Sequence, residues 1–336
     1  MINWSAQHRV TVIMPTWIGD VCMATPALHL LREAMPDDGH ITVGVRHGMK
    51  ALLAGLPTVD HIVRLDPRGM GGPCRAGRVI ASTAPDAVLV LPGSFRTAAA
   101  AWCSRSRRRV GYARDRRRWL LTDPVPQPDR SVPVSTIDWY AALVGTAAPP
   151  PPRLVVTDED AAAAAELVQP EPAYLLLIPG ANRVDKRWPV ERFAGVANTA
   201  HARHGWTTVI AGAPGERDLT AAVARGCTGP TIDLAALGGS LSALKGCVAG
   251  AQVVVSNDTG PRHIATALGT PVVSLFGPTD HRWTVTPAAA EVRLLSEPFL
   301  PKDLMADRHA SACGIDRIAE GDVLHAIERL AASPTR

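Results

Sequence analysis

The sequence predicts an α/β protein built from two Rossmann-like domains. Three features predict it: continuous apolar runs typical of buried parallel strands, helical spacing of apolar residues between them, and polar turns where the strands end. The chain has 336 residues, enough for two domains of ordinary size. The run AAPPPP at residues 147–152 forms a stiff, solvated spacer. We therefore expect a first domain over residues 1–150 and a second over residues 153–336.

In the first half, apolar runs predict strands at residues 10–14, 41–45, 62–65, 87–91 and 110–112. A helix is expected after the first strand through about residue 34, and a short one near residues 48–54. The glycine-rich residues 68–77 are expected to form a loose segment before the next helix. Each strand is thus followed by a connection that can return the chain to a parallel sheet.

In the second half, strands are expected at residues 173–179, 208–211, 253–255 and 272–276. Helices are expected after Thr157, after Pro189, over residues 240–249 and over residues 319–332. Thr157 leads into Asp158, Glu159 and Asp160, which matches the Asp-x-Asp pattern of metal-dependent glycosyltransferases. A capping residue followed by acids in the first turn is an ordinary helix start, so we assign no metal to it.

The composition favours a cytoplasmic location over a membrane-spanning or secreted one. Hydrophobic residues make up 46% and charged residues 20%, and no apolar run reaches the ~20 residues of a membrane helix. The N-terminal residues run directly into a strand and lack the apolar core of a signal peptide. The six cysteines are scattered and include no Cys-x-x-Cys, which disfavours a zinc site or a disulfide framework. We expect reduced thiols and a cytoplasmic location.

Residues 252–279 are the stretch around which the chain is organised: a strand, a polar turn, a helix and a second strand. Ligands of open α/β sheets bind outside the carboxyl ends of the strands, where this turn lies. Thr259 and Gly260 lead into Pro261, which suits the first helical turn, so free N–H groups would face an anion such as a diphosphate. His263, one turn further on, is expected on the side of the opening. The alternative is that Asp258 and Thr259 only cap the helix.

The motif SNDTG-xx-HIA-x-ALGTPVVSLFGPT, residues 256–279, resembles the signature of glycosyltransferase family 9, the lipopolysaccharide heptosyltransferases. Further stretches agree in order and spacing, so the resemblance covers nearly the whole chain. It implies the GT-B architecture, in which two Rossmann-like domains face one another across a cleft. The second domain would hold the nucleotide sugar, through Asp258, Thr259, Gly260 and His263. Arg262 departs from the pattern, because a small or apolar residue is expected there.

The first domain is implied to hold the acceptor and the base. MPTWIGDVCMATPAL, residues 14–28, resembles the N-terminal block whose aspartate is the proposed catalytic base, which is Asp20 here. The alternative is that Asp20 only stabilises the first turn of a helix. VLPGSFRTA, residues 90–98, resembles a second block, in which Ser94 could orient the acceptor or the donor. We expect Ser94 and Arg96 to contact the acceptor. A plain turn residue is the alternative for Ser94.

Eight arginines lie between positions 105 and 118. Three interpretations stay open: a nucleic-acid patch, a solvated face, and an entrance for an acceptor whose carboxylates and phosphates arginine binds in bidentate fashion. RVGYARDRRRWLLTD, residues 109–123, resembles a GW-x-RG-like segment of the family. The resemblance favours the entrance and implies that Arg114 contacts the acceptor.

Two further residues are candidates for the donor site. IPGA…KRWP, residues 178–189, resembles a donor-side loop in which Lys186 would meet the diphosphate, unless it is a solvent-facing charge. Glu216 lies just past a strand and could accept a ribose hydroxyl, although an acid in a first helical turn needs no ligand. CGIDRI, residues 313–318, resembles the family's C-terminal cysteine block. The last helix is implied to pack back on the first domain.

The implied reaction is an inverting, metal-independent transfer of L-glycero-D-manno-heptose from ADP-heptose to the lipopolysaccharide inner core, with no cofactor. Asp20 would take the acceptor proton, and Lys186 would stabilise the departing ADP. The alternatives are a transferase or epimerase of the same fold acting on another nucleotide sugar, a nicotinamide-dependent oxidoreductase, and a non-catalytic nucleotide- or nucleic-acid-binding protein. The absence of G-x-G-x-x-G disfavours the oxidoreductase. Stable nucleic-acid binding is not expected, whereas transient contact of Arg107, Arg108 and Arg109 with an anionic membrane surface is a hypothesis.

Overall fold

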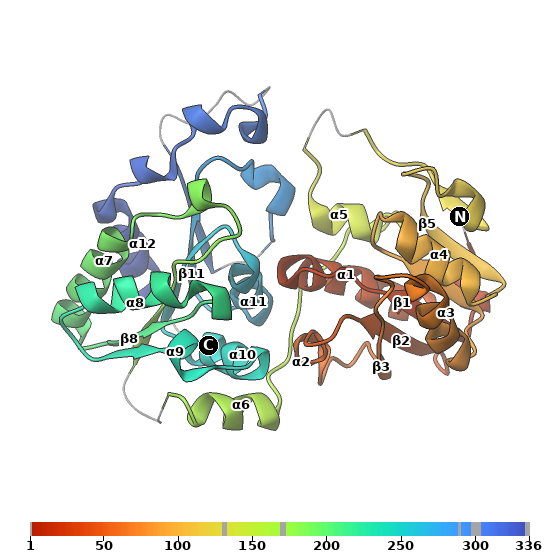
Figure 1. The fold of residues 1–336 in the computed structure, drawn as a ribbon, viewed down its shortest axis with the longest axis horizontal. Helices are drawn as coiled ribbons and strands as arrows, with labels where there is room; N and C mark the ends of the chain where they lie inside the picture. Colours follow the sequence, from red (N-terminus) through yellow and green to blue (C-terminus); the bar gives the residue numbers. More distant parts are fainter. Residues whose placement is uncertain (1, 130–132, 169–172, 288–289, 297–303, 333–336) are drawn as a thin grey trace. The chain divides into compact units, whose positions relative to one another are not determined.

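The computed structural model describes residues 2–129, 133–168, 173–287, 290–296 and 304–332. The chain divides into two compact units, Met1–Val155 and Val156–Arg336 (Figure 1). The division falls shortly after the proline run at residues 149–152. Each unit has a parallel sheet of its own.

The first unit contains a six-stranded parallel sheet in the order β3-β2-β1-β4-β5-β6. This is the order of a Rossmann fold, in which the chain reverses direction across the sheet between β1 and β4. All of the predicted strands of this half are present, and β6 is an addition. The strands are β1 (Arg9–Ile13), β2 (His40–Val45), β3 (His61–Arg64), β4 (Ala87–Val90), β5 (Arg108–Tyr112) and β6 (Asp123–Val125).

Five α-helices belong to the described part of the first unit. They are α1 (Ile18–Ala34), α2 (Lys50–Leu53), α3 (Gly72–Ser82), α4 (Phe95–Cys103) and α5 (Thr136–Ala141). Apolar residues of α3 and α4 pack on β1 and β4 in one buried cluster that includes Ile80, Ala101 and Val90. This packing fixes the turns at the carboxyl ends of β1 and β4.

The prediction of a loose segment over residues 68–77 is wrong in its second half, because α3 begins at Gly72. Gly71 takes φ +69°, a backbone conformation that glycine adopts without strain, and this turn starts the helix. Pro73 follows in the first turn, where its missing N–H leaves no hydrogen bond unmade. The glycines therefore start a helix here, although their number suggested a loop.

The second unit repeats the same topology. Its parallel sheet has the order β12-β11-β10-β7-β8-β9, so the chain reverses between β7 and β10. The four predicted strands are present, and β9 and β12 are additions. The strands are β7 (Tyr174–Ile178), β8 (Thr207–Ile210), β9 (Thr231–Asp233), β10 (Val253–Asn257), β11 (Val272–Phe276) and β12 (Glu291–Leu295).

The helices of the second unit cover both faces of its sheet (Figure 1). They are α6 (Asp158–Ala165), α7 (Val190–His204), α8 (Arg217–Gly226), α9 (Leu234–Leu237), α10 (Leu241–Gly250), α11 (Gly260–Leu268) and α12 (Glu320–Ala331). The terminal helix α12 buries Val323, Ile327 and Leu330 in the same cluster as Leu175 of β7 and Val255 of β10. It thus packs on its own sheet. That it also packs on the first domain stays a prediction.

Candidate functional site

The topology of the two sheets indicates where a ligand would bind. In a doubly wound sheet, ligands bind outside the carboxyl ends of the strands where the chain reverses direction, here called the switch point. The switch point lies between β1 and β4 in the first unit and between β7 and β10 in the second. Polar turns follow all four strands, as the sequence predicted.

Asn257, the last residue of β10, joins the two turns at the switch point of the second unit. Its side chain is fully buried, its Nδ2 donates to the Pro179 carbonyl at 2.8 Å, and its Oδ1 accepts from the Trp188 N–H at 3.2 Å. The turn after β7 is therefore held against the end of β10. Asn257 is not among the residues predicted from the sequence, although a polar residue closing a run of valines was a signal for it.

Lys186 and Asp258 form an ion pair at this switch point. The Lys186 Nζ lies 3.1 Å from the Asp258 Oδ2, and the side chains are only 14% and 11% exposed. The Thr279 hydroxyl donates to the same carboxylate oxygen at 3.1 Å. The interpretation of Lys186 as a solvent-facing charge is therefore wrong, because the folded loop directs it onto the carboxylate.

Arg262 is the second cation on Asp258, and it is fully buried. One terminal nitrogen lies 3.2 Å from the Asp258 Oδ1, and Nε lies 2.8 Å from the Glu291 carboxylate and 3.1 Å from the Ser274 hydroxyl. The guanidinium also lies over the Phe276 ring, 4.8 Å from its centroid. The residue that departed from the family pattern is thus a central contact of the site.

These contacts form a chain of alternating charges: Lys186, Asp258, Arg262, Glu291 and Arg293. Burial alone would raise the pKa of Asp258, but the charges of Arg262 and Lys186 lower it below its ordinary value. Asp258 therefore remains a carboxylate. Arg262 also pairs with Asp258, so this carboxylate does not depend on Lys186 alone for a cation.

The α11 N-terminus adjoins this pair. Thr259 is the N-cap residue and makes no side-chain capping bond, and Pro261 lies in the first turn. The interpretation that Asp258 and Thr259 only cap the helix is therefore wrong, because the carboxylate of Asp258 is directed to cations. The first N–H groups of α11 lack a side-chain cap and carry the positive end of the helix dipole.

His263 is buried and only 4% exposed, so it lies inside the protein rather than on the side of an opening. Its Nε2 is 3.3 Å from a terminal nitrogen of Arg262. Burial and the adjacent Arg262 charge lower the pKa of His263 to about 3. The imidazole is therefore neutral near pH 7, and its role as a donor-binding residue stays a prediction.

Glu216 lies at the end of the short 3₁₀ helix Pro214–Glu216 that follows β8. Its carboxylate accepts from the Ala213 N–H at 2.8 Å, as a capping acid does. The same carboxylate lies against Gly180, and a Cβ at that position would collide with it. Glu216 thus approaches the turn after β7, while ribose binding stays a prediction.

Asp20 occupies the switch point of the first unit, in the first turn of α1 after β1. Its side chain is half-buried and makes no hydrogen bond or ion pair with any residue in the described part of the chain. Burial raises the pKa of Asp20 to about 6. A carboxylate with that pKa is suited to accept a proton near neutral pH.

Ser94, Arg96 and Arg114 surround the end of β4 across the same switch point. Ser94 is exposed and is the N-cap of α4, where its hydroxyl accepts from the Thr97 N–H at 3.4 Å. Arg96 is exposed in the first turn of that helix. Arg114 lies along Gly93, where a Cβ would come within 2.7 Å of its Cδ. Ser94 therefore does act as a capping residue, and the acceptor role of all three stays a prediction.

The eight arginines of residues 105–118 do not form one solvated face, because several hold the fold together. Arg117 is fully buried and donates to the carbonyls of Tyr112 at 2.8 Å and Pro92 at 2.6 Å. Burial and the Arg114 charge lower the pKa of Arg117 to about 10. Arg108 pairs with Asp123, and Arg109 donates to the Leu120 carbonyl at 2.8 Å. Arg117 thus fixes the turn that carries Ser94.

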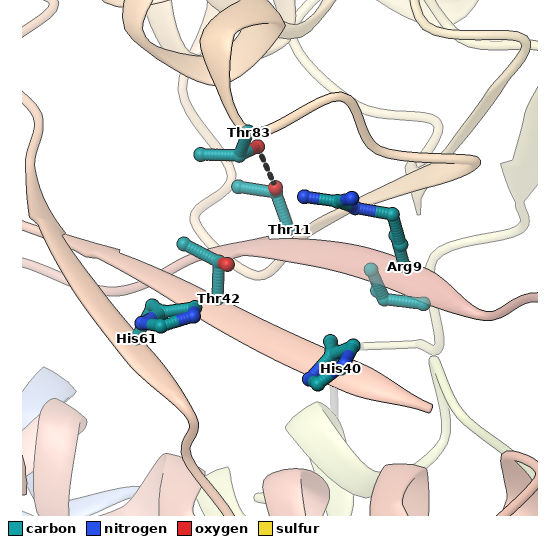
Figure 2. A pocket seen from close by; sticks show the side chains of 7 residues that line it. Arg9, Thr11, His40, Thr42, His61 and Thr83 are labelled. Carbon is teal, nitrogen blue, oxygen red and sulfur yellow. Dashed lines mark hydrogen bonds between the residues drawn. The ribbon is translucent and has the colours of Figure 1, made fainter. Parts of the chain in front are cut away.

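A separate pocket of about 110 Å³ lies at the opposite, amino end of the first sheet. Arg9, His40 and His61, the first residues of β1, β2 and β3, line it together with threonines (Figure 2). The hydroxyls of Thr11 and Thr83 lie 2.6 Å apart in its wall. Because the pocket is at the amino ends of the strands, it is not the candidate substrate site.

The Asp-x-Asp pattern after Thr157 is structural. Thr157 and Asp160 form a capping box, and the Asp160 carboxylate is paired with the buried Lys245 at 2.7 Å. In the part of the chain that the structure describes, no group of three or more His, Cys, Asp or Glu side chains could hold a metal ion. Over the same residues, no helix is long and apolar enough to cross a membrane.

The fold matches a known architecture. The solved structure of ADP-heptose lipopolysaccharide heptosyltransferase II from E. coli superposes with a TM-score of 0.82 at 21% identity, covering 96% of this chain and 98% of that chain. Two Rossmann-like units with this topology are the GT-B fold of glycosyltransferases, as expected from the sequence.

The family follows from the sequence comparisons. The model of glycosyltransferase family 9 (heptosyltransferase) matches residues 74–305, so the chain belongs to this family and is a glycosyltransferase. Lipopolysaccharide heptosyltransferase 2 of Escherichia coli K12 is 25% identical over 321 residues, 86% of this chain and 88% of that protein. Lipopolysaccharide heptosyltransferase 3 of Escherichia coli is 28% identical over 164 residues, so this match spans about half of either chain.

Proposed function

We propose that this chain transfers L-glycero-D-manno-heptose from ADP-heptose to the lipopolysaccharide inner core, with inversion and without a metal ion. The names of its relatives support the donor and the acceptor. The observation that carries the proposal is the Lys186–Asp258 ion pair at the switch point of the second unit. It adjoins a helix N-terminus without a side-chain cap, which favours an anionic ligand such as a diphosphate.

The donor is assigned to the second unit. The diphosphate of ADP-heptose accepts from the first N–H groups of α11 and attracts Lys186 away from Asp258. Arg262 then keeps Asp258 paired, so this exchange leaves no carboxylate buried alone. The leaving ADP gains negative charge as its bond to the sugar breaks, and Lys186 and the helix dipole stabilise that charge.

The base is assigned to the first unit. The acceptor hydroxyl attacks the anomeric carbon, the bond from that carbon to the ADP oxygen breaks, and Asp20 takes the hydroxyl proton. Because attack and departure occur on opposite faces, the anomeric configuration inverts. Ser94, Arg96 and Arg114 are assigned to the acceptor, whose phosphates and carboxylates suit arginine.

The test is ADP release from ADP-heptose in the presence of a truncated core acceptor, with EDTA present. Acceptor-dependent release by the wild type, lost in Asp20→Asn with ADP binding retained, supports the donor and the base together. Release that persists in Asp20→Asn rejects the base. Tight binding and turnover of another nucleotide sugar, with none of ADP-heptose, rejects the donor.

We also propose that the enzyme acts at the cytoplasmic face of the membrane and contacts it peripherally through the first unit. Phe95, Trp102 and Trp119 are exposed and lie near one another, with ring centroids 6.2 and 6.4 Å apart for the two pairs that include Trp119. Aromatic side chains and arginines together favour an anionic lipid surface. Sedimentation with anionic vesicles tests this, and unchanged binding of Trp102→Ala/Trp119→Ala would reject it.

A further inference from the structure

Cys74 and Cys103 bring two thiols together on one side of the first unit. The two Sγ atoms are 3.3 Å apart, although the residues are 29 positions apart in sequence. Cys74 is exposed near the start of α3, and Cys103 is the half-buried last residue of α4. Of the other cysteines, Cys22, Cys247 and Cys313 are buried.

The close approach of the thiols is built into the helix packing. A Cβ on Gly77 would come within 2.5 Å of the Cys103 Cβ and 3.0 Å of the Ala100 carbonyl oxygen. Only glycine at position 77 therefore lets the end of α4 lie this close to α3. Cys74, one turn before Gly77, then faces Cys103 across the contact.

The thiols open onto a groove of about 550 Å³ that is lined by arginines. Its lining residues are Cys74, Arg78, Trp102, Cys103, Arg105 and Arg109. Arg78 and Arg105 are exposed, and neither side chain pairs with another residue in the described part of the chain. Arg105 takes φ +58° just after α4, a conformation in which glycine is usual, so the position has a strained backbone and a cationic side chain.

We propose that Cys74 and Cys103 form a reversible disulfide site whose substrate is an anionic low-molecular-weight disulfide. The Cys74 thiolate attacks one sulfur of the small disulfide, forming a mixed disulfide and releasing one small thiolate. Cys103 then loses its proton to solvent and attacks the Cys74 sulfur, which releases the second small thiolate. The protein loses two electrons and two protons, and the small disulfide gains both as two thiols.

The groove gives this site its selectivity. The three arginines raise the local concentration of an anionic disulfide relative to a neutral one, an effect that salt screens. Burial and the contact with Cys74 raise the pKa of Cys103, so its attack on the mixed disulfide speeds up with rising pH. A disulfide here requires the sulfur atoms to move from 3.3 Å to about 2.05 Å, a small adjustment.

The test treats the reduced full-length protein with glutathione disulfide, which is anionic. The wild type is expected to lose two hydrogen atoms in intact mass and to yield a linked Cys74–Cys103 peptide. Cys103→Ser is expected to stop at the glutathione adduct on Cys74. A wild-type protein that only accumulates the adduct, or that yields no linked peptide, overturns the proposal.

The groove and the glycine are tested with matched controls. Arg78→Gln/Arg105→Gln is expected to slow the reaction with glutathione disulfide by roughly tenfold at low salt and to leave the reaction with neutral hydroxyethyl disulfide unchanged. Equal slowing of both reactions overturns the substrate class. Gly77→Ala is expected to slow ring closure, whereas Gly145→Ala, whose Cβ would meet nothing within 4 Å, is not.

Discussion

Asp20 follows β1 in the first unit and Asp258 follows β10 in the second, so each carboxyl group lies at the switch point of a six-stranded parallel sheet. Asp20 is half-buried and has no cation among the described residues, and its pKa is raised to about 6. Asp258 has two cations, and its pKa is lowered. The two carboxyl groups follow different strands of the shared topology, the first strand in one unit and the fourth in the other. One switch point thus holds an isolated carboxyl group with a raised pKa, and the other holds a carboxylate that is fixed by two cations.

The largest effect is expected from removing Asp20, the proton acceptor that we propose. Asp20→Asn keeps the shape of the side chain, and the turnover number should fall by about 10² to 10⁴-fold, the usual contribution of a general base. ADP release under saturating donor and acceptor measures it. Because the buried carboxyl disfavours ionisation, the variant should unfold at the same or a higher temperature at pH 7.

Asp138→Asn is the matched control for this variant, since Asp138 is an exposed acid in the first turn of α5. Its turnover number should match the wild type. A large loss in the control, or a small loss in Asp20→Asn, would place the base elsewhere.

The second prediction concerns stability and the chain of alternating charges around Asp258. Arg262→Met retains the length of the side chain but leaves Asp258 with one cation, Lys186, and leaves the nearly buried Glu291 with only the more distant Arg293. The free energy of unfolding should fall by about 3–5 kcal/mol, as when one partner of a buried ion pair is removed. Urea unfolding measures it.

Arg203→Met is the control, because Arg203 pairs with Glu328 on the surface. An exposed pair contributes at most about 1 kcal/mol, so its loss should be small. Adding Glu291→Gln to Arg262→Met should restore part of the lost stability. Equal, small losses in both single variants would show that Arg262 is not the centre of the network.

A smaller effect is expected from Lys186. Lys186→Gln removes the positive charge that we propose to bind the diphosphate. It leaves Asp258 paired with Arg262, so the free energy of unfolding should change little. ADP should bind about 10- to 100-fold more weakly, since one hydrogen bond to a charged group contributes about 1.5–3 kcal/mol. Calorimetric titration with ADP measures it, and Arg183→Gln in the same loop is the control because Arg183 pairs only with Asp185 among the described residues. Unchanged ADP affinity in Lys186→Gln would remove Lys186 from the donor site.

The contrast between inner and edge strands explains how much of the fold the sequence could predict. The inner strands were predictable because β4, β7, β10 and β11 are buried on both faces and read as continuous apolar runs. Three of the four edge strands, β6, β9 and β12, were missed because their residues are only half-buried and carry no such run. The fourth edge strand, β3, is also half-buried, but the apolar residues around Ile62 and Val63 were enough to predict it.

The sequence predicted individual residues of the candidate site but not the contacts between them. Lys186 and Asp258 were both proposed from their turns, yet their pairing joins positions 72 apart in sequence and depends on β7 lying beside β10. Glu291, one of the partners of Arg262, likewise comes from a distant strand, β12. The sequence did contain one signal for these contacts: Arg262 stands where a small or apolar residue is expected. A charged residue that is buried at such a position needs polar partners.

The last prediction concerns pH and separates the two carboxyl groups directly. The rate should rise with pH through about 6 and level off above it, because Asp20 can act as the proposed base only when it is ionised. Between pH 7 and pH 6 the rate should fall only about twofold, less than the loss expected from Asp20→Asn. A turnover profile between about pH 5 and pH 8 measures it. Lys186→Gln should keep the same midpoint at a lower rate, and a midpoint that shifts in that variant would assign the titration to the second unit.

Two titratable groups at the switch point of the second unit, Asp258 and His263, do not account for a midpoint near pH 6. The pKa of Asp258 is held below its ordinary value, and that of His263 is lowered to about 3, so neither changes charge near pH 6. The stability should carry the opposite sign from the rate. The folded state binds the Asp20 proton more tightly than the unfolded state, so the stabilisation is complete below about pH 4 and is lost as pH rises through about 6. Asp20→Asn should therefore abolish both the rise in rate and this loss of stability, and a variant that removed only one of them would separate the base from the buried carboxyl.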